Sequence, residues 1–168
     1  MFQRIAIIGP TNAGKSTLAR QITAVLHLPV HHLDKLFWLP GMLQVPEDER
    51  LRIHDRLIRA EAWIIDGGYA DDRQRSIERA DLVILMSLPR WTLMWRYINR
   101  VWKYHGETRP DMGGGNHERL NWFMVKGIMN HKGPQKRIDW IRREFPKNPL
   151  VVIRSRADAE RFVRSLRA

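Results

Sequence analysis

Short apolar runs alternate with longer amphipathic stretches along the chain. Short runs rich in β-branched residues are typical of strands buried on both faces of a parallel sheet. Five such runs predict strands at residues 4–8, 30–33, 63–66, 82–88 and 150–153. Apolar residues at helical spacing predict helices at residues 16–26, 46–62, 91–103, 118–131 and 134–145, and a last helix that ends near residue 166. This alternation predicts an α/β fold in which helices cover both faces of a parallel sheet and ligands bind at the carboxyl ends of the strands.

The predicted helix after the fourth strand has a wide apolar stripe. Trp91, Trp95 and Trp102 lie on this stripe, and Arg96 and Arg100 lie on the other side of the helix. A stripe at helical spacing usually faces a core. We therefore expect that these tryptophans, and those further along the chain, are mainly buried.

The composition indicates one globular domain over residues 1–168. Hydrophobic residues make up 43% of the chain and charged residues 28%, which is typical of a chain that builds its own core. The chain has no cysteine, which excludes disulfides and thiolate zinc sites. No apolar run approaches the roughly 18 residues of a membrane span, and the N-terminal segment lacks the apolar region of a signal peptide, so we expect a cytoplasmic protein.

Most of the net charge of +11 lies in one segment. Residues 90–147 contain 13 Lys and Arg but 5 Asp and Glu, a net charge of +8. We expect this basic, helical and lid-like region to meet an anion. Nucleic acid and the phosphates of a nucleotide both fit, and the charge alone does not choose between them.

Residues 9–16 read GPTNAGKS and match the phosphate-binding pattern G-x-x-x-x-G-K-S/T. The match lies between a predicted strand and a predicted helix, where backbone N–H groups and the helix N-terminus bind phosphate oxygens. Lys15 would reach the β- and γ-phosphates of a nucleoside triphosphate, and the Ser16 hydroxyl would bind Mg²⁺. An ordinary glycine-containing turn is the alternative. The candidate nucleotide-binding residues are Gly9, Asn12, Ala13, Gly14, Lys15, Ser16 and Thr17.

Two acids follow predicted strands. Asp34 comes after the second strand, where it would hydrogen-bond the hydroxyl of a phosphoryl acceptor or a water on Mg²⁺; a helix cap or a solvated carboxylate is the alternative. Asp66 ends the third strand and is expected to orient Mg²⁺ through its water shell, unless it only begins a turn before Gly67. His31 and His32 point to opposite faces of a strand, so we expect no metal shared between them.

Arg96 and Arg100 lie one helical turn apart. Such arginines can stabilise the charge on the equatorial oxygens of a transferring phosphoryl group, although a basic helix face is often only solvated. The glycines at 113–115 would let a flap with Arg109 and Arg119 close over the site.

Several motifs together resemble a known family. They are the phosphate loop, HLD at 32–34, FW at 37–38, WIIDG at 63–67, LPR at 88–90 and TRPDM at 108–112. Over nearly the whole chain, the sequence resembles the adenylate-kinase-related P-loop proteins often called DNA topology modulation proteins. More distantly, it is similar to nucleotide, shikimate and gluconate kinases.

The resemblance implies a five-stranded parallel sheet in the order 2-3-1-4-5, a helical lid insertion after strand four, and the use of ATP and Mg²⁺. It also implies roles for Lys15 and Ser16 at the phosphates and the metal, for Asp66 at the end of strand three, and for Arg96 and Arg100 as lid arginines. Asp34 is similar in position to the substrate-contacting aspartate of shikimate-type kinases. Adenylate kinases have Phe-Pro-Arg after the Asp-Gly of strand three, whereas the next arginine here is Arg73, which leaves the acceptor open.

Our leading hypothesis is an ATP-dependent kinase that phosphorylates a small molecule or a nucleotide, with Lys15, Arg96, Arg100 and Asp34 as its catalytic residues. The alternative is a nucleic-acid-binding protein with or without weak ATPase activity, favoured by the basic segment and its tryptophans. A nucleotide-sensing module without turnover is a third class.

Overall fold

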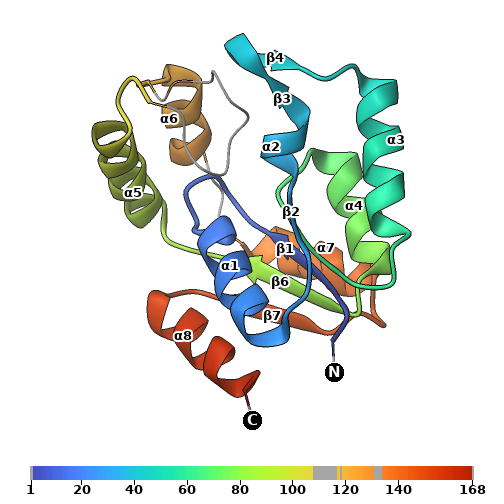
Figure 1. Cartoon of the computed structure of the whole chain (residues 1–168). Coiled ribbons are helices and arrows are strands. Elements are labelled where there is room, and N and C mark those ends of the chain that lie inside the picture. The colour runs from blue at the N-terminus through green and yellow to red at the C-terminus, as the bar shows by residue number, and fades with distance from the viewer. Residues whose placement is uncertain (1, 108–116, 118, 131–133, 168) are drawn as a thin grey trace.

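The computed structural model describes residues 2–107, 117, 119–130 and 134–167 (Figure 1). Its centre is a five-stranded sheet in the order β2-β5-β1-β6-β7, in which every neighbouring pair is parallel. The strands are β1 (Arg4–Ile8), β2 (Val30–His32), β5 (Trp63–Asp66), β6 (Leu82–Met86) and β7 (Leu150–Ile153). These are the five predicted strands in chain order, so the predicted order 2-3-1-4-5 is confirmed.

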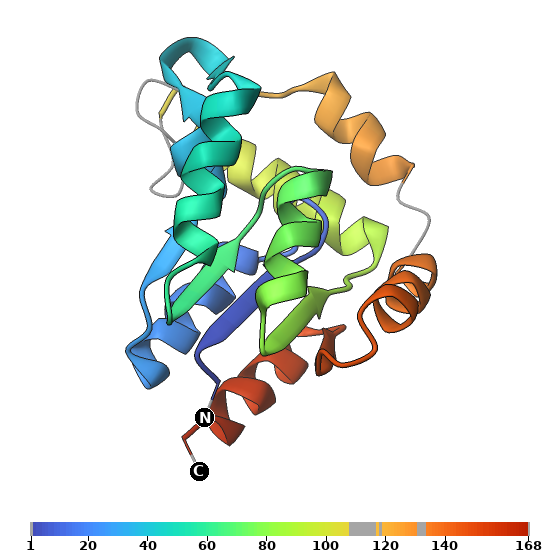
Figure 2. The ribbon, with the colours of Figure 1, turned by 90° about the vertical axis from the view of Figure 1, so that its right-hand side faces the viewer.

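Helices cover both faces of this sheet (Figure 1, Figure 2). Side chains of β1 alternate between two cores, with Ile5 and Ile7 in the first and Ala6 and Ile8 in the second. The three-layer α/β/α arrangement is therefore confirmed. The first core is covered by α1 (Lys15–Leu26), α5 (Arg90–Lys103), α6 (Trp122–Met129) and α8 (Arg156–Ser165), and the second by α3 (Glu47–Ile58), α4 (Ala70–Arg79) and α7 (Gln135–Glu144).

The pattern of apolar residues did not predict α4. The buried side chains of this helix are Asp72, Ser76 and Ile77. A helix whose inward face is largely polar lacks the repeat of apolar residues that predicts a helix. The α4 helix is held by partners from another helix, which no local pattern reveals.

The connection after β2 also holds more structure than predicted. The second strand ends at His32, and Leu33 starts a short helix, α2 (Leu33–Phe37). Leu33 and Phe37 are buried in the second core and anchor this helix. A small antiparallel hairpin follows, made of β3 (Trp38–Leu39) and β4 (Leu43–Gln44) around the 3₁₀ turn η1 (Pro40–Met42).

The prediction that the tryptophans of α5 are buried is wrong. Trp91 and Trp95 are exposed, and Trp102 is 84% exposed. The helix instead buries Leu93 and Tyr97 against the first core. Apolar residues occupy both sides of α5, so the repeat shows a helix but not which side faces inward. Trp122 of α6 is exposed as well, whereas Trp140 of α7 is partly buried against Phe145. In the described part of the chain, no helix combines the length and the hydrophobicity that a membrane span requires.

A buried polar cluster joins α3 to α4. Arg50 of α3 forms an ion pair with Asp72 of α4, and His54 lies 2.9 Å from the Ser76 hydroxyl. The Arg50 guanidinium also stacks 4.8 Å from the centre of the Tyr69 ring. His54 is fully buried, and this burial lowers its pKa below the usual 6.5, because desolvation disfavours the charged imidazole more than the carboxylates nearby favour it.

We predict that His54 makes the stability of the protein depend on pH. Below pH 6.5 the unfolded chain takes up a proton at this position that the folded chain resists, so stability is lost as the pH falls. The loss is at most about 1.4 kcal/mol per pH unit. Urea denaturation at about pH 7.5 and about pH 5.5 checks this, because the His54→Gln variant should lose less stability than the wild type over the same interval. Equal losses in both proteins would contradict the prediction.

Candidate functional site

The loop between β1 and α1 passes close to the sheet. A Cβ atom at Gly9 would lie 2.7 Å from the carbonyl oxygen of Met86, so only glycine fits there. Asn12 and Gly14 have left-handed φ angles of 64° and 92°, and α1 begins at the next residue, Lys15. A tight loop that leads directly into a helix N-terminus is the arrangement that binds phosphate through backbone N–H groups.

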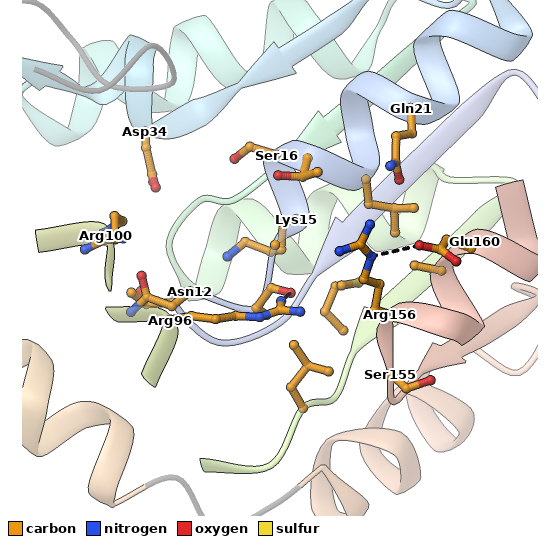
Figure 3. A pocket seen from close by; sticks show the side chains of 18 of the residues that line it. Asn12, Lys15, Ser16, Gln21, Asp34, Arg96, Arg100, Ser155, Arg156 and Glu160 are labelled. Atoms are coloured by element: carbon orange, nitrogen blue, oxygen red, sulfur yellow. Dashed lines mark hydrogen bonds and ion pairs between the residues drawn. The ribbon is translucent and has the colours of Figure 1, made fainter. Parts of the chain in front are cut away.

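A cavity of about 530 Å³, which we call the main cavity, opens beside this loop (Figure 3). The loop and the first turn of α1 form one wall, from Thr11 to Leu18. Side chains of α5 and α8 form other walls. A volume of several hundred Å³ is typical of a site for a small organic ligand.

Cationic side chains from three elements line the main cavity. The Lys15 ammonium donates a hydrogen bond to the carbonyl of Pro10 at 3.1 Å, and Arg96 donates to the carbonyl of Ala13 at 2.9 Å. Arg156 of α8 borders the same space and pairs with Glu160 at 2.8 Å. Burial, and secondly the charge of Arg156, lower the pKa of Arg96. The charge of Arg96 is thus held against the phosphate loop without a carboxylate partner among the described residues.

Asp66 lies beneath the first turn of α1. Its Oδ2 atom accepts a hydrogen bond from the Ser16 hydroxyl at 2.6 Å and lies 2.9 Å from Nδ1 of His32. Its side chain is 4% exposed, and its Oδ1 atom has no hydrogen-bond partner among the described residues. A buried carboxylate oxygen without a donor, next to a hydroxyl, fits a hydrated Mg²⁺ ion. Among the described residues no three His, Cys, Asp or Glu side chains group to hold a metal. Mg²⁺ is usually held by one or two carboxylates together with waters and substrate phosphates.

Asp34 lies in the first turn of α2 and is exposed. Its side chain points into the main cavity, toward Lys15 (Figure 3). Gly67 adjoins it, because a Cβ atom there would lie in ordinary contact, 3.4 Å from Oδ1 of Asp34. The residue that caps α2 is His32, so Asp34 is not the helix cap that was its alternative interpretation.

A second cavity, of about 160 Å³, adjoins the main cavity. Both cavities are lined by Thr11, Lys15 and Asp34, and Gly9 contributes to the second. The second cavity continues between the loop after β5 and the helices α4 and α7. The phosphate loop therefore borders two spaces that meet at Lys15.

The structure brings the predicted site residues together. Asp66 contacts Ser16, and Gly9 lies in the second cavity. The other predicted residues line the main cavity: Asn12, Ala13, Gly14, Lys15, Ser16, Thr17, Asp34, Arg96 and Arg100.

Of the residues named for the suggested flap, Arg119 belongs to the described part of the chain. Arg109 and the glycines at 113–115 lie outside the described residues. The described Arg119 contributes a backbone oxygen, 3.4 Å from the Tyr97 hydroxyl that donates to it.

Two residues of the site do not follow from the sequence pattern. Arg156 comes just after β7, whose carboxyl end lies on the same edge of the sheet as the phosphate loop, and that position is the signal that points to it. His32 meets Asp66 because β2 and β5 pair with these two residues opposite each other. This contact depends on β2 and β5 being neighbours in the sheet, and the tertiary fold decides which strands are neighbours.

The fold is that of the P-loop kinases. No protein-family model matches the chain, and no curated protein matches its sequence. Solved structures match over nearly the whole length. A shikimate kinase from Acinetobacter baumannii in complex with shikimate has a TM-score of 0.58 at 12% identity, over 99% of this chain and 91% of that chain.

Two further kinases have the same fold. A gluconokinase from Sinorhizobium meliloti 1021 has a TM-score of 0.52 at 16% identity, over 98% of this chain and 95% of that chain. A deoxyadenosine kinase from M. mycoides has a TM-score of 0.51 at 14% identity, over 97% of this chain and 98% of that chain. At such identities the similarity shows the fold, and the resemblance to DNA topology modulation proteins stays a prediction.

We predict that Gly9→Ala destabilises the protein more than Gly41→Ala. Gly41 has a φ of 78° with nothing within 4 Å of the position of a Cβ atom, so its substitution costs the backbone strain alone, about 1–2 kcal/mol. At Gly9 the contact with the backbone of Met86 adds about 1–3 kcal/mol of overpacking. Urea denaturation of both variants measures the difference. If the two variants were equally stable, the loop would not be wedged against β6.

Proposed function

We propose that the protein is a kinase that transfers the γ-phosphoryl group of ATP, with Mg²⁺, to a small-molecule or nucleotide acceptor. The observation that carries this proposal is the phosphate loop at the junction of two cavities, with Lys15 and Arg96 on it and Asp34 facing it. Phosphoryl transfer needs positioning and electrostatic stabilisation more than it needs covalent chemistry from the protein. The charged side chains of Lys15, Arg96 and Asp34 around the phosphate loop could supply this positioning and electrostatic stabilisation.

In this proposal the residues from Gly9 to Thr17 bind the polyphosphate through backbone N–H groups and the N-terminus of α1. Lys15 exchanges its hydrogen bond with the Pro10 carbonyl for the β- and γ-phosphates. Arg96 and Arg100 stabilise the negative charge on the equatorial oxygens of the moving phosphoryl group. Because a guanidinium stays protonated, they do so without any proton transfer.

Ser16 and Asp66 would hold Mg²⁺. An ion held there would supply positive charge to offset the negative charge that develops on the phosphates. The Ser16 hydroxyl donates to Asp66 and keeps its lone pairs for the ion. The Ser16 and His32 contacts both fix Oδ2 of Asp66, which leaves Oδ1 to accept from the ion's water shell.

Asp34 orients the acceptor. Its carboxylate accepts the hydrogen bond of an acceptor hydroxyl, whose oxygen forms a new bond to the γ-phosphorus. The bond between that phosphorus and the β–γ bridging oxygen breaks, ADP leaves, and the hydroxyl proton passes to Asp34 and then to water. The three structures with the same fold are named as kinases, which supports this class of reaction.

We expect that Lys15→Ala reduces the stabilisation of the protein by Mg·ATP. A ligand that binds the folded state raises its melting temperature, and removing the ammonium group should weaken binding of the triphosphate at least about tenfold. Any ATP-dependent turnover found in an acceptor screen should fall at least about 100-fold. Lys103→Ala is the matched control, because it removes the same charge from the exposed end of α5.

The kinase proposal fails if Mg·ATP does not raise the melting temperature of the wild type. It also fails if Lys15→Ala and Lys103→Ala respond to Mg·ATP alike.

Nucleic-acid binding is the second candidate function, and one observation favours it. Trp91, Trp95 and Trp102 form an exposed row on α5, and the guanidinium of Arg90 lies 5.4 Å from the centre of the Trp91 ring. Exposed aromatic rings beside cations are typical of surfaces on which the bases of single-stranded nucleic acid stack. This surface lies apart from the phosphate loop in sequence. Binding of nucleic acid to it would not depend on phosphoryl transfer.

If this candidate is right, single-stranded DNA binds the protein and loses affinity steeply as the salt concentration rises from about 50 to about 200 mM. Trp95→Ala and Trp102→Ala should each weaken binding by about 1–3 kcal/mol, because each removes a stacking surface. Fluorescence anisotropy of a labelled oligonucleotide measures both effects, with the partly buried Trp140→Ala as control. Absence of binding at about 50 mM salt would exclude this function.

A further inference from the structure

The second cavity leads away from the nucleotide side of the phosphate loop. It shares Lys15 and Asp34 with the main cavity, so a γ-phosphate held by Lys15 would face it. It is also lined by Gly67 and Gly68 and by two arginines, Arg73 of α4 and Arg137 of α7. With about 160 Å³, it is smaller than the roughly 300–1,000 Å³ typical of sites for drug-sized ligands.

Arg73 and Arg137 bring two positive charges together in a partly buried position. Burial lowers the pKa of both, and the charge of Arg137 lowers that of Arg73 further. Arg73 donates one long hydrogen bond, 3.4 Å, to the carbonyl of Gly68. Among the described residues, neither arginine has a carboxylate within ion-pair distance. The two guanidinium groups thus line the second cavity, and neither is paired there with a described carboxylate.

The acid that could have neutralised Arg73 is already used elsewhere. Asp72, its neighbour on α4, forms an ion pair with Arg50 and accepts a hydrogen bond from the backbone N–H of Tyr69 at 3.0 Å. Like charges that are partly removed from water destabilise a fold unless an anion compensates them. The planar guanidinium fork matches the oxygens of a carboxylate or a phosphate group. A ligand anion between Arg73 and Arg137 would supply this compensation.

Asp34 determines which end of the ligand reacts. A carboxylate accepts hydrogen bonds and donates none, so it attracts a hydroxyl and repels a phosphate at the same place. The position beside Lys15 and Asp34 therefore suits an acceptor hydroxyl, and the position between the arginines suits an acid group. Both requirements are met by side chains that line one small cavity.

We propose that the second cavity is the acceptor site and that it binds a small alcohol carrying an acid group, with the acid on Arg73 and Arg137 and the reacting hydroxyl on Asp34. This inference rests on the proposed kinase function and adds the chemical class of the substrate. An acceptor that reacts through its own phosphate, as a nucleoside monophosphate does, is disfavoured by the carboxylate of Asp34. The acid group is a carboxylate or a phosphate monoester.

The test measures binding of an anion when the nucleotide site is full. The protein is saturated with Mg²⁺ and AMP-PNP, whose terminal phosphate occupies the γ position, and inorganic phosphate or acetate is then titrated while the melting temperature is followed. We expect a saturable rise with at least one of the two, and the anion that binds more tightly identifies the acid group. Arg73→Gln and Arg137→Gln should each weaken this binding at least about tenfold and change the affinity for AMP-PNP by less than about twofold.

Matched controls come from the same two helices. Arg75→Gln removes a charge from α4 that is paired with Asp55 at 2.7 Å, and Arg142→Gln removes an exposed charge from α7. Both should bind the anion like the wild type. Arg137→Lys keeps the charge without the fork and should fall between the wild type and Arg137→Gln. The melting temperature of each variant without ligand shows whether it is folded.

A second measurement compares ATP turnover with matched pairs of alcohols, gluconate against sorbitol and glycerol 3-phosphate against glycerol. Turnover restricted to acidic members, with a raised KM in Arg73→Gln, supports the proposal, and turnover of an uncharged alcohol that is insensitive to Arg73→Gln overturns it. Anion binding that is absent, or that survives both arginine substitutions, overturns the acceptor site while the kinase proposal stands. Failure of AMP-PNP to bind overturns the kinase proposal and the acceptor site together.

Discussion

The site depends on the register of three neighbouring parallel strands. Asp66 of β5 pairs with Ile7 of β1 on one side and with His32 of β2 on the other. This register puts the Asp66 carboxylate under the first turn of α1, where Ser16 and His32 both contact the same oxygen, at 2.6 and 2.9 Å. A slip of one residue would turn Asp66 to the opposite face of the sheet and separate it from Ser16. The apolar side chains on both faces of β1 hold the register, because a slip would exchange the contents of the two cores.

Charge is distributed around this point in a way that a folded chain without a ligand does not favour. Arg96 is held against the phosphate loop by a carbonyl oxygen, and Arg73 by a long hydrogen bond to another. The acid of the Arg50–Asp72 ion pair is used between α3 and α4, whereas Glu160 pairs with Arg156 at the wall of the main cavity. The main cavity and the second cavity meet at Lys15 and Asp34, one cationic and one anionic side chain. In the proposed phosphoryl transfer, the main cavity would hold the donor and the second cavity the acceptor.

The repeat of apolar residues predicted the sheet well and the helices less well. The five strands are nearly continuous apolar runs because both of their faces are buried, so local sequence and tertiary environment agree. The α4 helix was missed because Asp72 and Ser76 face inward, where they are satisfied by Arg50 and His54 of α3. The buried side of α5 was assigned wrongly because both sides are apolar, and contact with the first core selects Leu93 and Tyr97 over the tryptophans. Arg137 was noticed only as part of a basic segment, since nothing local shows that α7 carries it into a cavity.

The phosphate loop, the order of the five strands along the chain and the residue types at their carboxyl ends could be read from the sequence. These are local properties: glycines where the backbone turns, a lysine and a serine at a helix N-terminus, and acids after apolar runs. Which of these side chains meet follows from the tertiary fold. His32 reaches Asp66 through strand pairing, Arg156 reaches the main cavity through the last crossover, and Arg73 and Arg137 share the second cavity although 64 residues separate them. The physical reason is that contacts between distant segments follow from how the helices pack on the sheet, and that packing is set by the shapes and volumes of two whole cores rather than by any single motif.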